Sequence, residues 1–454
     1  MRDLLTLIVM LYRLDPRNFA SPKDVFRRQQ RNLRRLLTDA KAHSPFYARR
    51  FAGIDVGTCD LSALPTVSKA ELMSNLDDVF TDRRVKRADI ERFIADRQNL
   101  GRLFLGTYGI SHTSGSQGQP ALIVQHKSEL IQMFAVQFMR GAKLRNRWTP
   151  HLNRLFHPAR MAVMTQHAGF YPSGAAFSYL PDGIKPCVNV LKLSVFDPIE
   201  TSVAQLNAFR PEFIVGYASS LDVLAREERA GRLKLKSAGC LELVTSISEP
   251  LPPDAAQALR EAFGVPVSNQ YAMGECMCLS CGCLETPGAH LNADLAVLEV
   301  VANHNQPVPP GTPGSKVLLT NLSNRVQPFI RYEIDDLVTM SPTPCGCGSP
   351  LPLITSITGR EKDKFWIEVG GKYRELPYYV FLAGLHHELG MAEHQVLQTG
   401  KNSFVIRAVP RPGVRLSIER LKELVQHSVD VEGLGSVVTF DVEIVPQIER
   451  AASG

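Results

Sequence analysis

A regular alternation of strand and helix patterns between residues 213 and 268 restricts the fold of this chain most strongly. Short apolar runs at 213–217, 241–246 and 265–268 predict strands, and helical patterns at 221–230 and 253–263 separate them. Strands that are joined through helices pair in parallel, because the helix carries the chain back to the edge where it started. We therefore expect an α/β fold, in which a large N-terminal domain holds parallel sheets with flanking helices.

The chain beyond residue 357 has a different pattern. Alternating runs predict short strands at 365–369, 370–373, 395–398, 404–408 and 439–445, and the one clear helix is expected at 418–429. A chain of 454 residues that is 44% apolar can bury more than one core. We expect a large domain over residues 1–357 and a small α+β domain over residues 358–454.

One loop, Ser111–Pro120, is dense in hydroxyl and glycine residues. It follows a strand-like run (Leu103–Leu105, then Ile110) and precedes a helix that is expected from Ser128. Backbone N–H and side-chain O–H groups packed this closely can converge on a phosphate. Such clusters are more often plain surface loops, and this one has neither the lysine of a Walker A loop nor GxGxxG spacing. The candidate phosphate-binding residues are Thr113, Ser114, Gly115, Ser116, Gln117 and Gly118.

Three further stretches follow this loop in a fixed order: Asn269–Glu275 (NQYAMGE), Pro328–Asp336 (PFIRYEIDD) and Thr358–Asp363 (TGREKD). Together the four stretches resemble the adenylate-forming (acyl-CoA synthetase) superfamily, and within it the phenylacetate-CoA ligase-like branch. The resemblance extends over nearly the whole chain from about Val25 onward. It implies an ATP-dependent, AMP-forming ligase that converts a carboxylic acid, by default an aromatic one, into acyl-AMP and then passes it to a thiol such as CoA. It also implies a mobile C-terminal lid domain.

The resemblance also implies roles for single residues. Tyr271 would stack on adenine, Glu275 would coordinate Mg²⁺, and Asp336 would accept the ribose hydroxyls. Arg360 would contact the ribose or phosphate, and Lys362 would lie at the hinge of the C-terminal domain. For each of them the alternative is an ordinary surface residue, and only their order along the chain favours the functional interpretation.

Two further stretches carry weaker signals. The turn Ile247–Pro250 resembles a family element that borders adenine, which makes Ser248, Glu249 and Pro250 candidates, although Ile247 replaces the usual glycine. Phe170 and Tyr171 are candidates for the acyl pocket, and ordinary core or surface aromatics are an equally good interpretation.

The sequence also departs from the family pattern. Gln117 and Gln119 replace a hydroxyl residue and a lysine in the phosphate loop, so other residues must supply the missing positive charge. The family's catalytic lysine follows a Val-Pro element near the C-terminus, but no lysine follows Lys422 here. The chain would then be truncated before that lysine, or activate its acid differently, or adenylate weakly. Other acceptors (an amine or a carrier-protein thiol) and a non-catalytic binding protein of this fold remain alternatives.

Cysteine usage is the second strong signal. Six of the nine cysteines lie in two groups, at 276–283 and 345–347. Nothing indicates secretion, so disulfides explain these groups poorly, and thiolates with an imidazole form closed tetrahedral Zn²⁺ sites. We expect Cys283, His290, Cys345 and Cys347 to hold a structural zinc ion, a metal knot like those of the phenylacetate branch. Cys281 could replace Cys283, and reduced cysteines without metal or a redox-sensing set are the alternatives.

Charge and hydropathy limit the partners. The net charge of +6 is mild, and no basic run is interleaved with aromatic residues, so we expect no nucleic-acid partner. The apolar run Leu4–Tyr12 is too short to span a bilayer and lacks a cleavage site. We favour a packing helix or homodimer contact over a membrane contact, and expect a soluble cytoplasmic protein whose partners are a small-molecule acid and a thiol acceptor.

Overall fold

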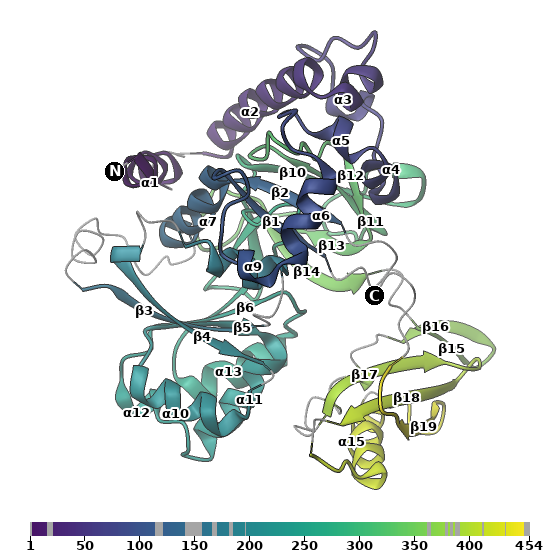
Figure 1. Cartoon of the computed structure of the whole chain (residues 1–454). Coiled ribbons are helices and arrows are strands. Elements are labelled where there is room, and N and C mark those ends of the chain that lie inside the picture. Colours follow the sequence, from purple (N-terminus) through teal and green to yellow (C-terminus); the bar gives the residue numbers. More distant parts are fainter. Residues whose placement is uncertain are drawn as a thin grey trace. The chain divides into compact units, whose positions relative to one another are not determined.

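The structure is a computed structural model that describes residues 2–15, 21–113, 121–140, 157–165, 170–180, 185–195, 197–360, 365–376, 380–381, 385, 391–410, 413–431 and 433–448. It divides into two compact units, residues 1–358 and residues 359–454 (Figure 1). The boundary expected from the sequence, after residue 357, lies one residue before this division.

The first unit contains a five-stranded parallel sheet in the order β4-β3-β5-β6-β7. Its strands are β3 (Ala159–Thr165), β4 (Val188–Ser194), β5 (Phe213–Tyr217), β6 (Leu243–Ile247) and β7 (Val267–Gln270). Four of the helices that connect them are grouped along one side of the sheet (Figure 1): α10 (Ile199–Phe209), α11 (Ala218–Arg229), α12 (Leu235–Ala238) and α13 (Pro253–Phe263). Buried aliphatic side chains such as Ile214, Leu224, Val244 and Leu259 join both layers into one core. The predicted parallel sheet is confirmed.

Two antiparallel sheets bring distant parts of the chain together. One has the order β10-β11-β12 and the other β13-β14-β9-β8. Their strands are β8 (Ser280–Gly282), β9 (Ala289–Leu291), β10 (Ala296–Val301), β11 (Lys316–Asn321), β12 (Tyr332–Ile334), β13 (Asp336–Met340) and β14 (Leu353–Arg360). Because β14 pairs with β9 so that Leu353 lies opposite His290, the two groups of cysteines become neighbours.

The phosphate-loop candidate joins two paired strands. β1 (Tyr108–His112) and β2 (Leu122–His126) form an antiparallel pair, and α7 (Lys127–Arg140) follows. A short helix, α9 (Pro172–Ser178), contacts β1. The expected strand at 103–105 was wrong: Leu105 has φ 50, and Phe104 bonds to Tyr108 across a turn, so the strand begins only at Tyr108.

The described residues of the N-terminal part include the α-helices α1 (Arg2–Leu14), α2 (Pro22–His43), α3 (Pro45–Arg50), α4 (Lys69–Ser74), α5 (Leu76–Val79) and α6 (Arg87–Ala95). Ser21 and Ser44 each cap a helix whose first residue is a proline, which explains the break between α2 and α3. Ser68 accepts the backbone N–H of Glu71 on its hydroxyl and so caps α4. No helix among the described residues is both long enough and apolar enough to cross a bilayer.

The second unit is a small α+β unit. A three-stranded sheet combines β17 (Met391–Gln398), β18 (Ser403–Pro410) and β19 (Thr439–Ile444), with α15 (Ile418–Val431) packed against it. A separate hairpin pairs β15 (Phe365–Val369) with β16 (Lys372–Leu376), and Gly370 and Gly371 form its turn rather than the start of the predicted strand. Phe381, Phe404 and Leu421 lie in the core of this unit.

Candidate nucleotide site and cysteine–histidine cluster

Two of the sequence motifs meet through tyrosine–carboxylate hydrogen bonds. The Tyr271 hydroxyl donates to Asp336 Oδ2 at 2.7 Å. The Tyr332 hydroxyl donates to Glu275 Oε1 at 3.2 Å. Each bond joins one residue of the stretch 269–275 to one residue of the stretch 328–336, so the structure brings Tyr271, Glu275 and Asp336 together as the motif order implied.

Glu275 is the buried charge of this group. Only 8% of its surface is exposed, and burial raises its pKa above 4.5 although Tyr332 and the nearby Lys69 lower it. The neighbouring Asp336 raises the pKa further. A buried carboxylate with another carboxylate nearby favours either protonation or a cation.

Lys69 connects this group to the phosphate-loop candidate. Its Nζ lies 3.4 Å from Thr113 Oγ1, and its charge acts on Glu275. Thr113 also accepts the Ala121 N–H at 2.8 Å on its hydroxyl, which closes the base of the loop. The start of the loop, Lys69 and the carboxylates therefore lie in one region of the first unit.

Rigid contacts hold the backbone of the site. The Ser280 hydroxyl bonds to both the N–H and the carbonyl oxygen of Tyr271, at 2.9 and 2.7 Å. Asn321 Nδ2 donates to the Glu275 carbonyl oxygen at 2.7 Å. Arg331, next to Tyr332, forms two 3.1 Å hydrogen bonds with the Glu299 carboxylate, a geometry that fixes its strand firmly.

The turn expected to border adenine has a clear local role. Ser248 adopts φ 65, so the left-handed residue is Ser248 and not Ile247, where the family has glycine. The Glu249 carboxylate accepts the backbone N–H and the hydroxyl of Ser219, at 2.8 and 3.0 Å, at the start of α11. Burial raises the pKa of Glu249. Pro250, half-buried, follows directly.

The two aromatic candidates for the acyl pocket differ. Phe170 is 2% exposed and contacts Phe93, as a core residue does. Tyr171 is half-buried, and its ring lies 5.0 Å from that of His112, the residue before Thr113. Both lie next to the phosphate-loop candidate, because the Phe170 carbonyl oxygen accepts the His112 N–H at 2.8 Å, but only the Tyr171 ring is in contact with the His112 ring.

Several predicted site residues lie outside the described residues: Ser114, Gly115, Ser116, Gln117, Gly118 and Lys362. Arg360 is described only as the last backbone position of β14. The sequence reasoning missed Lys69 and Tyr332. Tyr332 lay inside a motif already quoted, but Lys69 had no signal beyond its position in the first turn of a capped helix.

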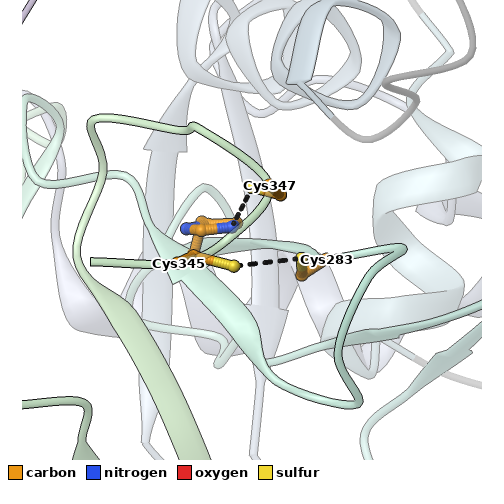
Figure 2. Close-up of side chains that lie close together, drawn as sticks. Cys283, Cys345 and Cys347 are labelled. Carbon is orange, nitrogen blue, oxygen red and sulfur yellow. Dashed lines mark hydrogen bonds between the residues drawn. The ribbon is translucent and has the colours of Figure 1, made fainter. Parts of the chain in front are cut away.

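The four predicted metal ligands gather in a separate cluster. The ligand atoms of Cys283, His290, Cys345 and Cys347 all lie within 4.8 Å of one another. Figure 2 shows Cys283 and Cys345 directed toward each other, with Cys347, which follows on the same loop as Cys345, close by. The two sulfurs lie 3.7 Å apart, close to the ~3.8 Å that tetrahedral Zn–S bonds of about 2.3 Å would give.

The histidine of this cluster is already oriented as a ligand. Its Nδ1 lies 3.1 Å from the Leu351 carbonyl oxygen, and its Nε2 lies 3.3 Å from Cys347 Sγ. Only a protonated Nδ1 can donate to the carbonyl, so in the neutral ring Nε2 carries the free lone pair.

The thiols of the cluster do not all have the same electrostatics: burial raises the pKa of Cys347 to about 11. Burial raises the pKa of Cys283, but hydrogen bonds with His290 and with the Glu285–Thr286 segment outweigh it and lower the pKa to about 6. Burial raises the pKa of Cys281 to about 12. Cys281 Sγ faces the His290 carbonyl oxygen and Asn292 Oδ1, each at 3.8 Å, so Cys281 is not the alternative ligand considered from the sequence.

Comparison with known proteins agrees with this geometry. Residues 106–318 match the family described as AMP-binding enzyme. The phenylacetate-coenzyme A ligase of Thermus thermophilus is 25% identical over 353 residues, which cover 74% of this chain and 70% of that protein. The phenylacetate-coenzyme A ligase of Pseudomonas putida is 23% identical over 364 residues, covering 77% and 74%.

A solved structure extends the likeness to the fold of both units. The crystal structure of 2-hydroxyisobutyryl-CoA ligase in the postadenylation state superposes with a TM-score of 0.62 and 20% identity, over 94% of this chain and 87% of that chain. The fold, the matched region and the relatives agree with the resemblance found in the four motifs. The chain is therefore similar to adenylate-forming acyl-CoA synthetases in its AMP-binding region, in its relatives and in its fold.

Proposed function

We propose that the chain is an ATP-dependent, AMP-forming acid–CoA ligase. The carboxylate of an acid attacks the α-phosphate of ATP, and the bond to pyrophosphate breaks. The thiol of CoA then attacks the acyl carbon of the acyl-AMP, so that the thioester forms and AMP is released. An aromatic acid is the default substrate, because both relatives named above are phenylacetate-CoA ligases.

The convergence of motifs around Glu275 carries this proposal. Residues from four separate stretches, Lys69, Thr113, Glu275 and Asp336, lie within one electrostatic group. An enzyme that binds a nucleotide triphosphate needs a cation near the phosphates and hydrogen-bond acceptors near the ribose. In this group Lys69 is the cation and the Asp336 carboxylate is the hydrogen-bond acceptor.

Each side chain then has a task in binding and orientation. Asp336 would accept the ribose hydroxyls, with Tyr271 held beside it to stack on the base. Lys69 would bind the phosphates near Thr113. It would replace the positive charge of the family's loop lysine, whose position is occupied by Gln119 in this chain. Glu275 would hold Mg²⁺, whose charge would favour the ionised carboxylate and balance the phosphate oxygens.

The cysteine–histidine cluster is proposed as a structural zinc site. Three thiols and one imidazole make a complete tetrahedral donor set, which leaves no position for a substrate. Such a site would clamp the loop that holds Cys345 and Cys347 to the β8–β9 hairpin. Because all nine cysteines are free and thiolate ligands need reducing conditions, a cytoplasmic location belongs to this proposal.

The second unit is proposed as the lid of the enzyme. Lys362 would be its hinge, and Arg360, just before it, would contact the ribose or phosphate. The proposal rests on the sequence motif at 358–363, because the structure describes neither the Arg360 side chain nor Lys362.

An acid-dependent ATP–pyrophosphate exchange assay tests the proposed function. We expect exchange with at least one aromatic acid, and thioester formation when CoA is added. Exchange without thioester formation would point to another acceptor. Absence of exchange with every acid, together with absence of ATP binding, would leave a non-catalytic protein of this fold.

A further inference from the structure

The second helix carries most of the net charge of the protein. Residues 22–43 contain seven lysine and arginine residues against two aspartates, a net charge of +5 within a chain whose total is +6. Four of these cations, Lys23, Arg27, Arg31 and Arg35, recur every fourth residue, and all four are exposed. They form a basic ladder that extends for about 18 Å along one face of α2.

The ladder differs from the other cations of the same helix. Arg34 donates to the carbonyl oxygens of Val56 and Cys59, and Lys41 donates to that of Ile54, so these two cations hold the fold. Within the described part of the chain, the side chains of Lys23, Arg31 and Arg35 form no hydrogen bond or ion pair with another residue. Arg27 approaches Asp24 at 3.7 Å, and its side chain is 73% exposed.

The spacing of the ladder works against helix stability. Like charges four residues apart on a helix repel one another across a turn. The internal contacts of the fold therefore do not explain the ladder. An external anionic surface would turn the same charges into a favourable interaction.

The preceding helix, α1, carries an exposed apolar stripe. On α1, the side chains of Leu5, Ile8, Val9 and Tyr12 are 63%, 54%, 39% and 65% exposed, at positions that share one helix face. The opposite face packs into the core through Leu7 and Leu14, as a packing helix should. That interpretation leaves the exposed stripe unexplained.

A hydrogen bond joins the two helices: Arg28 of α2 donates to the Arg13 carbonyl oxygen of α1 at 2.6 Å. In Figure 1, α1 lies near the N-terminal end of α2. Phe26, on the first turns of α2, adds a 60% exposed aromatic ring to the ladder.

We propose that α1 and α2 form a docking surface for an anionic phospholipid membrane, with the ladder on the headgroups and the α1 stripe in the interfacial region. Apolar side chains on one helix with arginines beside them are the combination that binds such interfaces. A second copy of the chain fits less well, because a two-fold contact through α2 would face one ladder with another. The proposal is independent of the proposed ligase activity.

Vesicle sedimentation of the full-length protein tests this proposal. The probes are vesicles of phosphatidylcholine alone and of phosphatidylcholine with phosphatidylglycerol in equal parts, at low and high salt. We expect binding only to the anionic vesicles at low salt. The triple variant Arg27→Glu, Arg31→Glu and Arg35→Glu should bind at least roughly 100-fold more weakly, because each cation near a charged bilayer contributes about 1 kcal/mol. Leu5→Ser with Ile8→Ser should weaken binding about ten-fold.

A matched variant separates a docking surface from net charge alone. Arg97→Glu, Arg102→Glu and Lys234→Glu make the same change in charge at exposed positions elsewhere in the first unit, and should retain most of the binding. Equal loss in both triple variants would overturn the proposal, as would no binding to anionic vesicles by the unaltered protein. A ladder variant that changes the oligomeric state but not vesicle binding would also overturn it and assign the face to a second copy. Circular dichroism and ATP binding, unchanged in the ladder variant, would exclude misfolding.

Discussion

The two ends of the segment 271–290 carry different kinds of side chain. At one end, Tyr271 and Glu275 form hydrogen bonds with oxygen groups of the stretch 328–336. At the other end, Cys283 and His290 join Cys345 and Cys347 around one point. Oxygen donors suit exchangeable partners such as Mg²⁺ and ribose, whereas a full set of sulfur and imidazole donors suits a permanent ion.

Electrostatics sharpen this difference. Burial raises the pKa of Glu275, so its ionised form is unfavourable until a cation binds. Hydrogen bonds lower the pKa of Cys283 to about 6 against the effect of burial, so its thiolate is favoured in advance. The first site therefore depends on its ligand for charge balance, whereas in the second the fold favours one thiolate, that of Cys283, while burial raises the pKa of Cys347 to about 11.

The largest expected effect comes from removing a ligand of the cysteine–histidine cluster. In Cys345→Ser, zinc affinity should fall by more than about 100-fold, because a lost ligand costs more than a lost supporting hydrogen bond. Elemental analysis of the purified protein should find about one zinc per chain before the change and almost none after it. Thermal unfolding should occur at a clearly lower temperature.

Cys281→Ser is the matched control for this experiment. Cys281 is as buried as Cys283, but its sulfur faces a carbonyl oxygen and an amide oxygen instead of the cluster. The variant should keep its zinc. Equal zinc loss in both variants, or a fully stable protein without metal, would remove the distinction between the two kinds of cysteine.

Glu275→Gln tests the other end of the segment. The amide keeps the shape and can still pair with Tyr332, but it has no charge for Mg²⁺. We expect Mg-dependent pyrophosphate exchange to fall by about 100-fold or more, with folding intact. Glu129→Gln is the control, because Glu129 is also buried but bonds to the His126 backbone N–H at the start of α7. Unchanged exchange in Glu275→Gln would refute the role of Glu275.

The two ends also differed in how far the sequence could predict them. Thiolates and imidazoles are few and their chemistry is narrow, so the set 283, 290, 345 and 347 could be chosen without a fold. The hydrogen-bond partner of Tyr271 could not be predicted from the sequence, because Asp336 lies 65 residues further along the chain and only the sheets bring the two residues together.

Helix α13 was predicted to the residue, since a proline begins it and Gly264 ends it in the left-handed conformation. The strand after it begins two residues later than predicted, because its apolar run starts in the connection at Val265 and Pro266.

Lys69→Ala tests the link between the oxygen site and the phosphate-loop candidate. Lys69 touches Thr113 and its charge lowers the pKa of Glu275, so its loss should weaken ATP use. We expect kcat/KM for ATP to fall about ten-fold, with partial recovery in Lys69→Arg because the charge returns in a different shape. Lys234→Ala, at an exposed position of the same unit, should leave the kinetics unchanged. If Lys69→Ala behaves like that control, the missing charge of Gln119 is supplied elsewhere.

The smallest expected effect is on stability, and its sign follows from the raised pKa of Glu275. The carboxyl has an ordinary pKa of 4.5 and a higher pKa in the folded protein, so the folded state binds the proton more tightly than the unfolded state. The protonated carboxyl of Glu275 therefore contributes stability to the folded protein that is fully present below pH 4.5. This contribution is lost as the pH rises from 4.5 through the folded pKa. In Glu275→Gln this loss is absent. Without nucleotide, the melting temperatures of the two proteins should be similar at about pH 4, and the variant should be the more stable by a few degrees at about pH 8.

Mg²⁺ with ATP should reduce this difference in melting temperature, because it stabilises only the protein that keeps its carboxylate. A gap that is the same at both pH values would mean that Glu275 is not a buried charge waiting for a cation, and the contrast with the cysteine cluster would then have no electrostatic basis.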